Sequence, residues 1–167
     1  MTLCWDTMDS PVGELLLVAH GERLRVIRFE REEPHEPPAD ARRGGAALKR
    51  AARQLGEYFQ GRRRTFDLEL DPVGTPFQRR VWRELGRIGY GATITYGDLA
   101  RRVGNPRASR AVGAANGQNP IPIVLPCHRV IGSDGRLTGF GGGLDVKRWL
   151  LELEGALSPL LHAARRR

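Results

Sequence analysis

Short apolar stretches separated by turn residues make up the first thirty positions of the chain. The segments TLCWDTM, ELLLVAH and LRVIRFE are largely apolar, and SPVG and GER stand between them. Runs of this length bounded by Gly, Pro and Ser are typical of strands joined by tight turns. We therefore expect a three-stranded antiparallel meander from Met1 to about Phe29.

The following forty residues predict a loop, a helix and one more strand. Residues 30–40 hold five acidic side chains and three prolines around His35, with little to bury, so we expect an exposed connection or a mobile loop. In AALKRAARQLGEYFQG the apolar residues recur at helical spacing, and Gly61 is a suitable stop. TFDLELD alternates in the manner of a strand, with its apolar positions at Phe66, Leu68 and Leu70.

A turn-rich segment, DPVGTP, separates this mixed pattern from a helical one. We place a domain boundary here and expect a small α/β domain over residues 1–72 and a mainly helical domain over residues 73–167. Thr75 is a suitable N-cap and Pro76 a suitable first residue for a helix along FQRRVWRELGRI.

The segment TYGDLARRVGNPRASRAVGAANGQNP predicts two helices joined by a short turn at VGNP. Thr95 can cap the first helix, and Asn105 followed by Pro106 can open the second. A helix, a tight turn with glycine and a second helix are typical of a helix-turn-helix element.

The remaining segments complete the predicted second domain. GSDGRLTGFGGG has six glycines in twelve residues and indicates a hairpin or wing beside the helix-turn-helix. LDVKRWLLELEG predicts a closing helix that ends at Gly155. We expect residues 156–167, which finish in three arginines, to be loosely held.

The charge of the chain favours a polyanionic partner. Its formal net charge is +8 and its sequence pI about 10.6, supplied almost wholly by arginine. From Arg79 to Arg110, eight arginines stand against two acidic residues, a local balance of +6 around the predicted helix-turn-helix. The alternatives are a solvated helical face and arginine enrichment from a GC-rich genome. Because solvated faces usually mix signs, we favour contact with nucleic acid.

Two further patterns limit the location of the protein. The chain has no apolar run of transmembrane length, and its N-terminus lacks both a basic start and a hydrophobic signal core. We therefore expect a cytoplasmic, nucleoid-associated protein with no membrane partner.

Only two cysteines occur, Cys4 and Cys127, which is too few for a disulfide scaffold or a four-cysteine zinc site. Cys4 lies in a strand-like stretch and is interpreted as structural. Cys127 precedes His128 within an apolar run, and the thiol needs a base or cationic surroundings to become a good nucleophile. Glu154, among the leucines of the last helix, is a candidate to orient that base, whereas a surface position at the helix end is the alternative.

These segments also match a known family. The run NPIPIVLPCHRVIG, followed by GFGGG and KRWLLELEG and preceded by ITYGDLA and SRAVGAA, resembles the O6-alkylguanine-DNA alkyltransferases, or methylated-DNA–protein-cysteine methyltransferases. The resemblance implies an α+β fold, with a ribonuclease-H-like N-terminal α/β domain and a C-terminal winged helix-turn-helix domain that carries the active cysteine. It also implies direct reversal of O6-alkylguanine and O4-alkylthymine damage by one irreversible alkyl transfer after nucleotide flipping.

The same resemblance implies four catalytic residues. Cys127 would accept the alkyl group, and His128 would act as its base through a bound water. Glu154 would hold the histidine tautomer. Asn119 would tie the recognition helix to the cysteine loop. No cofactor or metal is expected.

The resemblance implies roles in DNA and base recognition as well. Tyr96 would press on the phosphate backbone, Arg110 would replace the flipped nucleotide in the stack, and the Val130 carbonyl and the Gly141 amide would read the guanine edge. Small residues in the second helix would allow close approach to the minor groove of double-stranded DNA, largely independent of sequence. The DNA-binding set further includes Ala108, Ala111, Asn116 and Phe140.

Two departures and two alternatives qualify the resemblance. Phe140 stands where many relatives have tyrosine, so only packing is expected there, and the first domain lacks the zinc ligands of some relatives. A non-catalytic lesion sensor or helix-turn-helix regulator is the first alternative, and a cysteine hydrolase is the second. We expect a monomer, while cooperative binding along DNA stays open.

Overall fold

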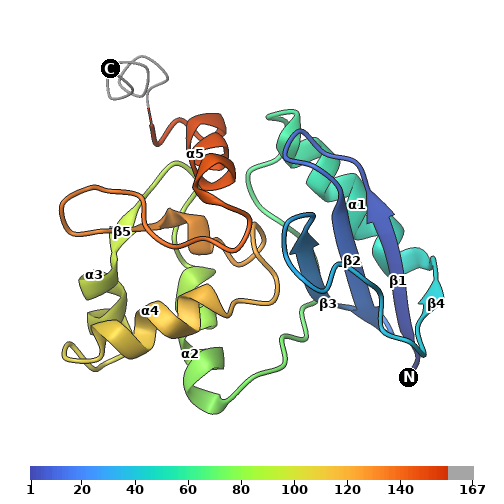
Figure 1. Ribbon diagram of the computed structural model, residues 1–167, viewed down its shortest axis with the longest axis horizontal. Coiled ribbons are helices and arrows are strands. Elements are labelled where there is room, and N and C mark those ends of the chain that lie inside the picture. Colours follow the sequence, from blue (N-terminus) through green and yellow to red (C-terminus); the bar gives the residue numbers. More distant parts are fainter. Residues whose placement is uncertain (158–167) are drawn as a thin grey trace.

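The computed structural model describes residues 1–157 and consists of a sheet-based half and a helical half (Figure 1). The N-terminal half holds the larger sheet with α1 against it. The C-terminal half gathers α2, α3, α4 and α5 around the segment that contains Cys127. The predicted tail lies almost entirely outside the described residues. No helix in the described part is both long and apolar enough to cross a membrane.

The predicted meander is confirmed. Strands β1 (Leu3–Met8), β2 (Leu15–His20) and β3 (Arg23–Phe29) pair antiparallel, and β2 is almost wholly buried between its neighbours. The sheet order is β3-β2-β1-β4, because β4 (Arg42–Arg43) adds a short parallel edge strand beside β1. No sequence pattern indicated β4, since two exposed arginines carry no hydrophobic alternation.

Helix α1 (Ala46–Phe59) lies against the sheet, as its apolar spacing predicts. Gly61 adopts φ 74° just after the helix, a conformation that glycine reaches without strain, so its predicted role as a stop is confirmed. Burial of a large apolar side chain contributes about 1.5–3 kcal/mol. The apolar residues that this helix buries are Leu48, Ala51, Leu55, Tyr58 and Phe59.

The strand predicted over TFDLELD is wrong. Only an isolated parallel bridge joins Leu70 to Leu24. The backbone of Asp67 instead hydrogen-bonds the Gln54 side chain, which donates to its carbonyl at 3.1 Å and accepts from its amide at 2.9 Å. A side chain therefore satisfies the groups that a neighbouring strand would have used.

Two helix starts follow the predicted capping and one does not. Thr75 before α2 (Pro76–Leu85) and Thr95 before α3 (Tyr96–Arg102) both form capping boxes. The helix α4 (Ser109–Gly117) begins later than predicted, with Ala108 as N-cap. Asn105 does not cap this helix; its side chain accepts from the amide of Arg107 at 3.3 Å inside the connecting turn.

The predicted wing has no strands of its own. Residues 132–136 close a tight turn through the Gly132 amide and the Arg136 carbonyl at 2.9 Å, and the glycine loop from 137 to 143 continues without regular structure. The strand β6 (Val130–Ile131) pairs parallel with β5 (Ile94–Thr95), directly before α3. Helix α5 (Leu144–Leu153) follows the glycine loop, and Glu154 is its C-cap residue.

The two halves are joined by hydrogen bonds as well as by packing. The amide of Ile27 on β3 donates to the carbonyl of Pro120 at 2.9 Å, just before the cysteine segment. Arg31, after β3, forms a bidentate ion pair with Asp145 at the start of α5, at 2.7 and 2.8 Å. The N-terminal half thus contacts both the cysteine segment and the glycine loop region.

Candidate active site

Cys127 begins a short 3-10 helix (Cys127–Arg129) and is buried, with 6% of its surface exposed. Its amide donates to the Leu125 carbonyl at 2.8 Å. Ile123, in the preceding segment, has φ 74°, a conformation that is strained for a β-branched residue and costs about 1–3 kcal/mol. The surrounding structure therefore holds the segment before Cys127 in a backbone conformation that it would not favour in isolation.

Asn119 holds both ends of this segment. Its Nδ2 donates to the Leu125 carbonyl at 2.6 Å, and its Oδ1 accepts from the Ile121 amide at 3.0 Å. Because α4 ends two residues earlier, at Gly117, the side chain joins the end of that helix to the cysteine segment. This is the geometry expected of a residue that ties a helix to the cysteine loop.

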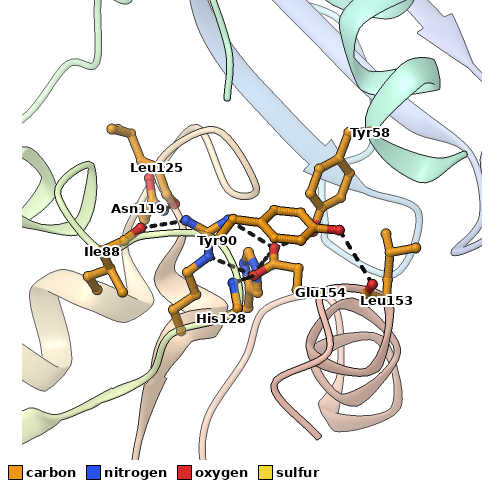
Figure 2. A network of polar contacts seen from close by, with 10 residues as sticks. Tyr58, Ile88, Tyr90, Asn119, Leu125, His128, Leu153 and Glu154 are labelled. Carbon is orange, nitrogen blue, oxygen red and sulfur yellow. Dashed lines mark hydrogen bonds and ion pairs between the residues drawn. The ribbon is translucent and has the colours of Figure 1, made fainter. Parts of the chain in front are cut away.

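Glu154 lies at the centre of a buried polar network (Figure 2). Its Oε2 pairs with His128 Nε2 at 2.7 Å and accepts from the Tyr58 hydroxyl at 2.5 Å. Arg129 donates to both carboxylate oxygens, from Nε at 2.8 Å and Nη2 at 3.0 Å, and its Nη1 donates to the Ile88 carbonyl at 2.5 Å. The surface position considered as an alternative for Glu154 is therefore wrong.

The network fixes the charge of Glu154 and His128. Burial works to raise the pKa of Glu154, but hydrogen bonds from His128 and Arg129 outweigh it and lower that pKa to about 2. Burial lowers the pKa of His128, with the carboxylate opposing this in part. A neutral His128 that donates from Nε2 to Glu154 leaves Nδ1 as an acceptor. Nδ1 is buried and has no hydrogen-bond partner within residues 1–157.

Burial also controls the thiol. It raises the pKa of Cys127 to about 11, against the hydrogen bond of Asn119 and the positive charge of Lys147, which both lower it. Lys147 is itself fully buried, donates to the carbonyls of Val130 and Thr138 at 2.7 and 2.8 Å, and has its pKa lowered to about 8 by burial. Cys127 is therefore a protonated thiol in the free protein at neutral pH.

One pocket collects most of the residues expected to meet the base. Phe140 and Gly141 of the glycine loop reach it from one side, and its lining also includes Cys127, Asn116, Asn119 and Glu32. Phe140 packs on Phe29 of the N-terminal half, with ring centroids 5.3 Å apart. The Val130 carbonyl, in contrast, already accepts a hydrogen bond from Lys147.

Most of the residues expected to meet DNA lie outside this pocket. Arg110 and Ala111 on α4 are exposed and Ala108 is half-buried, so none of the three lines the pocket. Tyr96 at the start of α3 joins this helix to the glycine loop, because its hydroxyl accepts from Thr138 Oγ1 at 3.2 Å. All eight arginines between positions 79 and 110 are exposed.

Comparison with known proteins agrees with this arrangement. Residues 3–72 match the family model described as the ribonuclease-like domain of 6-O-methylguanine DNA methyltransferase, and residues 76–156 match its DNA binding domain. A methylated-DNA–protein-cysteine methyltransferase of Methanosarcina acetivorans is 48% identical over 149 residues, covering 89% of this chain and 96% of the relative. The chain belongs to the 6-O-methylguanine DNA methyltransferase family.

Further members of this family are equally similar. The methylated-DNA–protein-cysteine methyltransferase of Mycobacterium tuberculosis is 50% identical over 158 residues, covering 92% of this chain and 93% of the relative. The crystal structure of an O6-methylguanine methyltransferase from the same organism aligns with a TM-score of 0.84 at 48% identity, over 95% of this chain and 96% of that one. A complex of the M. tuberculosis protein OGT with DNA aligns with a TM-score of 0.85 at 48% identity, over 92% and 93%.

Three residues of the site were not predicted from the sequence. Arg129 and Tyr58 complete the Glu154 network, and Lys147 binds the carbonyl of Val130. Arg129 lies within the PCHR motif, so its position beside the cysteine could have suggested a role. Tyr58 is 96 residues from Glu154 on the predicted helix of the other domain, and only the packing of the two halves brings them together.

Proposed function

We propose that the protein reverses O6-alkylguanine and O4-alkylthymine damage in DNA directly, by one irreversible transfer of the alkyl group to Cys127. The observation that carries this proposal is the arrangement of the buried thiol. Cys127 lies in a pocket beside Asn119, and the adjacent His128 has one ring nitrogen held by Glu154 and the other free to accept a proton. This is the nucleophile, base and orienting group that covalent transfer requires.

The chemistry follows from these positions. His128, acting through a water, removes the thiol proton, and Glu154 stabilises the imidazolium that forms. The sulfur then attacks the alkyl carbon in line, so that a C–S bond forms while the C–O6 bond breaks. Guanine leaves with that electron pair and takes up a proton. The thioether on Cys127 is not hydrolysed, and each molecule therefore reacts once.

Access to the base requires that the nucleotide leave the stack. A lesion on the base edge is unreachable inside a duplex, and flipping costs a few kcal/mol. We assign Arg110, exposed on α4, to the vacated space, and Tyr96 to the neighbouring phosphate. Ala108 is half-buried and Ala111 exposed at the start of α4, and their small side chains would let this helix approach the minor groove closely. The M. tuberculosis complex with DNA supports DNA as the partner.

Base recognition falls to the glycine loop and the strand after the cysteine. The Gly141 amide and the second lone pair of the Val130 carbonyl read the guanine edge, and Phe140 and Asn116 pack beside the base. We place the domain boundary between residues 72 and 73, and we expect a monomer that acts on the nucleoid in the cytoplasm.

The decisive experiment is the intact mass of the protein after incubation with duplex DNA that contains O6-methylguanine. The wild-type chain is expected to gain one methyl group, which peptide mapping places on Cys127. Cys4→Ala should gain it equally, and Cys127→Ala should not. Binding without a change in mass would contradict transfer and favour a lesion sensor, whereas repeated turnover of an ester would favour a cysteine hydrolase.

A further inference from the structure

The turn after β3 brings an acidic side chain of the N-terminal half to the cysteine pocket. Glu32 lines this pocket together with Cys127, Asn119 and Gly141. A Cβ added at Gly141 would lie 2.5 Å from Glu32 Oε2 and 3.1 Å from Glu32 Cδ. The carboxylate therefore lies against the Gly141 backbone, and a side chain at position 141 would force the end of the Glu32 side chain to shift.

The position of Glu32 is fixed by the core of the N-terminal half. Its amide donates to the Phe29 carbonyl at 3.0 Å, and its Oε1 accepts from the Phe29 amide at 3.0 Å. Phe29 is 2% exposed and packs on Phe140, while His35 contacts the same Phe29 carbonyl through Nδ1 at 3.0 Å. The turn, the buried phenylalanine and the glycine loop thus form one packed unit that holds the carboxylate at the pocket.

The charge of Glu32 acts on the reacting sulfur. Among the groups around Cys127, burial and the Glu32 carboxylate raise the thiol pKa, and Asn119 and Lys147 lower it. The neighbouring cation, Arg31, does not line this pocket and forms its bidentate ion pair with Asp145. An alkyl group between Gly141 and the sulfur would therefore meet a negative charge on the protein.

We propose that Glu32 is a specificity-determining residue that selects uncharged alkyl groups for transfer to Cys127 and rejects adducts that carry a negative charge. The inference rests on the proposed function. A guanine whose O6 approaches the Gly141 amide places its alkyl group beside this carboxylate. Methyl and ethyl groups meet no electrostatic penalty there, whereas a carboxyalkyl group brings a second negative charge into a partly buried site, where repulsion is weakly screened.

The test compares O6-methylguanine and O6-carboxymethylguanine in the same duplex. Single-turnover rate constants are measured by protein mass for the wild type, Glu32→Gln, and the matched control Glu33→Gln, whose side chain is exposed in the same loop. Glu32→Gln is expected to raise the carboxymethyl rate relative to the methyl rate by about tenfold, the change that removal of one like charge from a partly buried site can produce. Glu33→Gln should leave the ratio at the wild-type value. An unchanged ratio in Glu32→Gln overturns the proposal.

A second readout needs no DNA. Iodoacetamide and iodoacetate alkylate thiols by the same displacement but differ in charge, and peptide mapping reports Cys127 and Cys4 separately. Glu32→Gln should raise the iodoacetate to iodoacetamide ratio at Cys127 and leave the ratio at Cys4 unchanged; equal ratios at Cys127 in both proteins contradict the charge selection. A wild-type chain that takes no methyl group from DNA contradicts the proposed function, whereas methyl transfer with unaltered selectivity in Glu32→Gln contradicts this inference alone.

Discussion

At the scale of single residues, Glu154 is the acceptor at the centre of the buried polar network. One buried carboxylate accepts hydrogen bonds from Tyr58 on α1 and from His128 and Arg129 beside the cysteine, so two segments that are distant along the chain depend on its charge. The leucines around Glu154 predicted that this carboxylate orients the histidine, and the histidine is its partner at 2.7 Å. The arginine and tyrosine partners were not predicted, because the pattern around each is also that of an ordinary surface or core residue.

Replacement of Glu154 by Gln is expected to lower the free energy of unfolding by about 3–5 kcal/mol, since it leaves the Arg129 charge buried without its counterion. Urea unfolding measures this, with Glu69→Gln, 70% exposed at its side chain, as a control that should change stability by less than about 1 kcal/mol. The pKa of Glu154 is lowered from 4.5 to about 2 in the folded chain. Its contribution is therefore complete above about pH 4.5 and is lost as the pH falls toward 2, so the difference between variant and wild type should narrow over that range. If the difference in free energy of unfolding between Glu154→Gln and the wild type is the same at every pH, the lowered pKa of Glu154 is contradicted.

Arg110 gives a residue-scale prediction about DNA rather than stability. Arg110→Ala should slow methyl transfer from duplex DNA more than transfer from the free O6-methylguanine base, because only the duplex leaves a vacant stack to fill. Arg102→Ala, exposed on the preceding helix, removes the same charge and is the matched control. If Arg110→Ala lowers the methyl-transfer rate equally on duplex DNA and on the free base, the stacking role of Arg110 is contradicted.

At the scale of elements, the predictions from nearby residues were confirmed where a helix end is capped by residues within a few positions of it. The capping boxes at Thr75 and Thr95 and the stop at Gly61 follow from residues within a few positions of each helix end. The strand expected over TFDLELD failed because its backbone groups find a partner in Gln54, thirteen residues away from Asp67. Alternation of apolar and polar residues indicates which side chains face a core. The hydrogen-bond partners of the backbone, however, depend on how the segments pack.

The N-cap at Thr75 gives a testable prediction about the stability of α2. Thr75→Ala should lower the free energy of unfolding by about 1 kcal/mol, because the Gln78 amide loses its side-chain acceptor at 3.1 Å. Denaturant unfolding provides the measurement, and Thr65→Ala, in an exposed bend, serves as the comparison with an expected change within about 0.5 kcal/mol. If both variants lose the same stability, the cap is not responsible.

At the scale of the whole molecule, positive charge and acceptor chemistry occupy different surfaces. The exposed arginines from Arg79 to Arg110 belong to α2, α3, the start of α4, the turn after α2 and the turn before α4. The pocket is lined by the glycine loop, the cysteine segment, the end of α4 and the turn that holds Glu32. Tyr96 connects the two through Thr138. In the proposed function, the helices would hold DNA by its phosphates while one base enters the pocket.

This separation predicts a steep salt dependence of DNA affinity with little dependence on sequence. If about four phosphates are contacted, raising salt from roughly 50 to 200 mM should weaken binding by about 100-fold. Fluorescence anisotropy with an unmodified duplex measures it, and Arg107→Gln should reduce the logarithmic slope by about one if that arginine contacts a phosphate. A flat salt response would contradict binding led by phosphates.

The sequence by itself determined the three-stranded meander, the order of the helices, most helix starts, the family resemblance and the neighbouring Cys127 and His128. Each of these depends on residues that are close together along the chain. Tertiary structure decided the hydrogen-bond partners of Glu154, the hydrogen bond from Lys147 to the Val130 carbonyl and the close contact of Glu32 with Gly141. These contacts join segments that are distant along the chain or belong to different halves of the molecule. Their geometry depends on how the two halves pack into one shared hydrophobic core, which no local pattern of apolar and polar residues specifies.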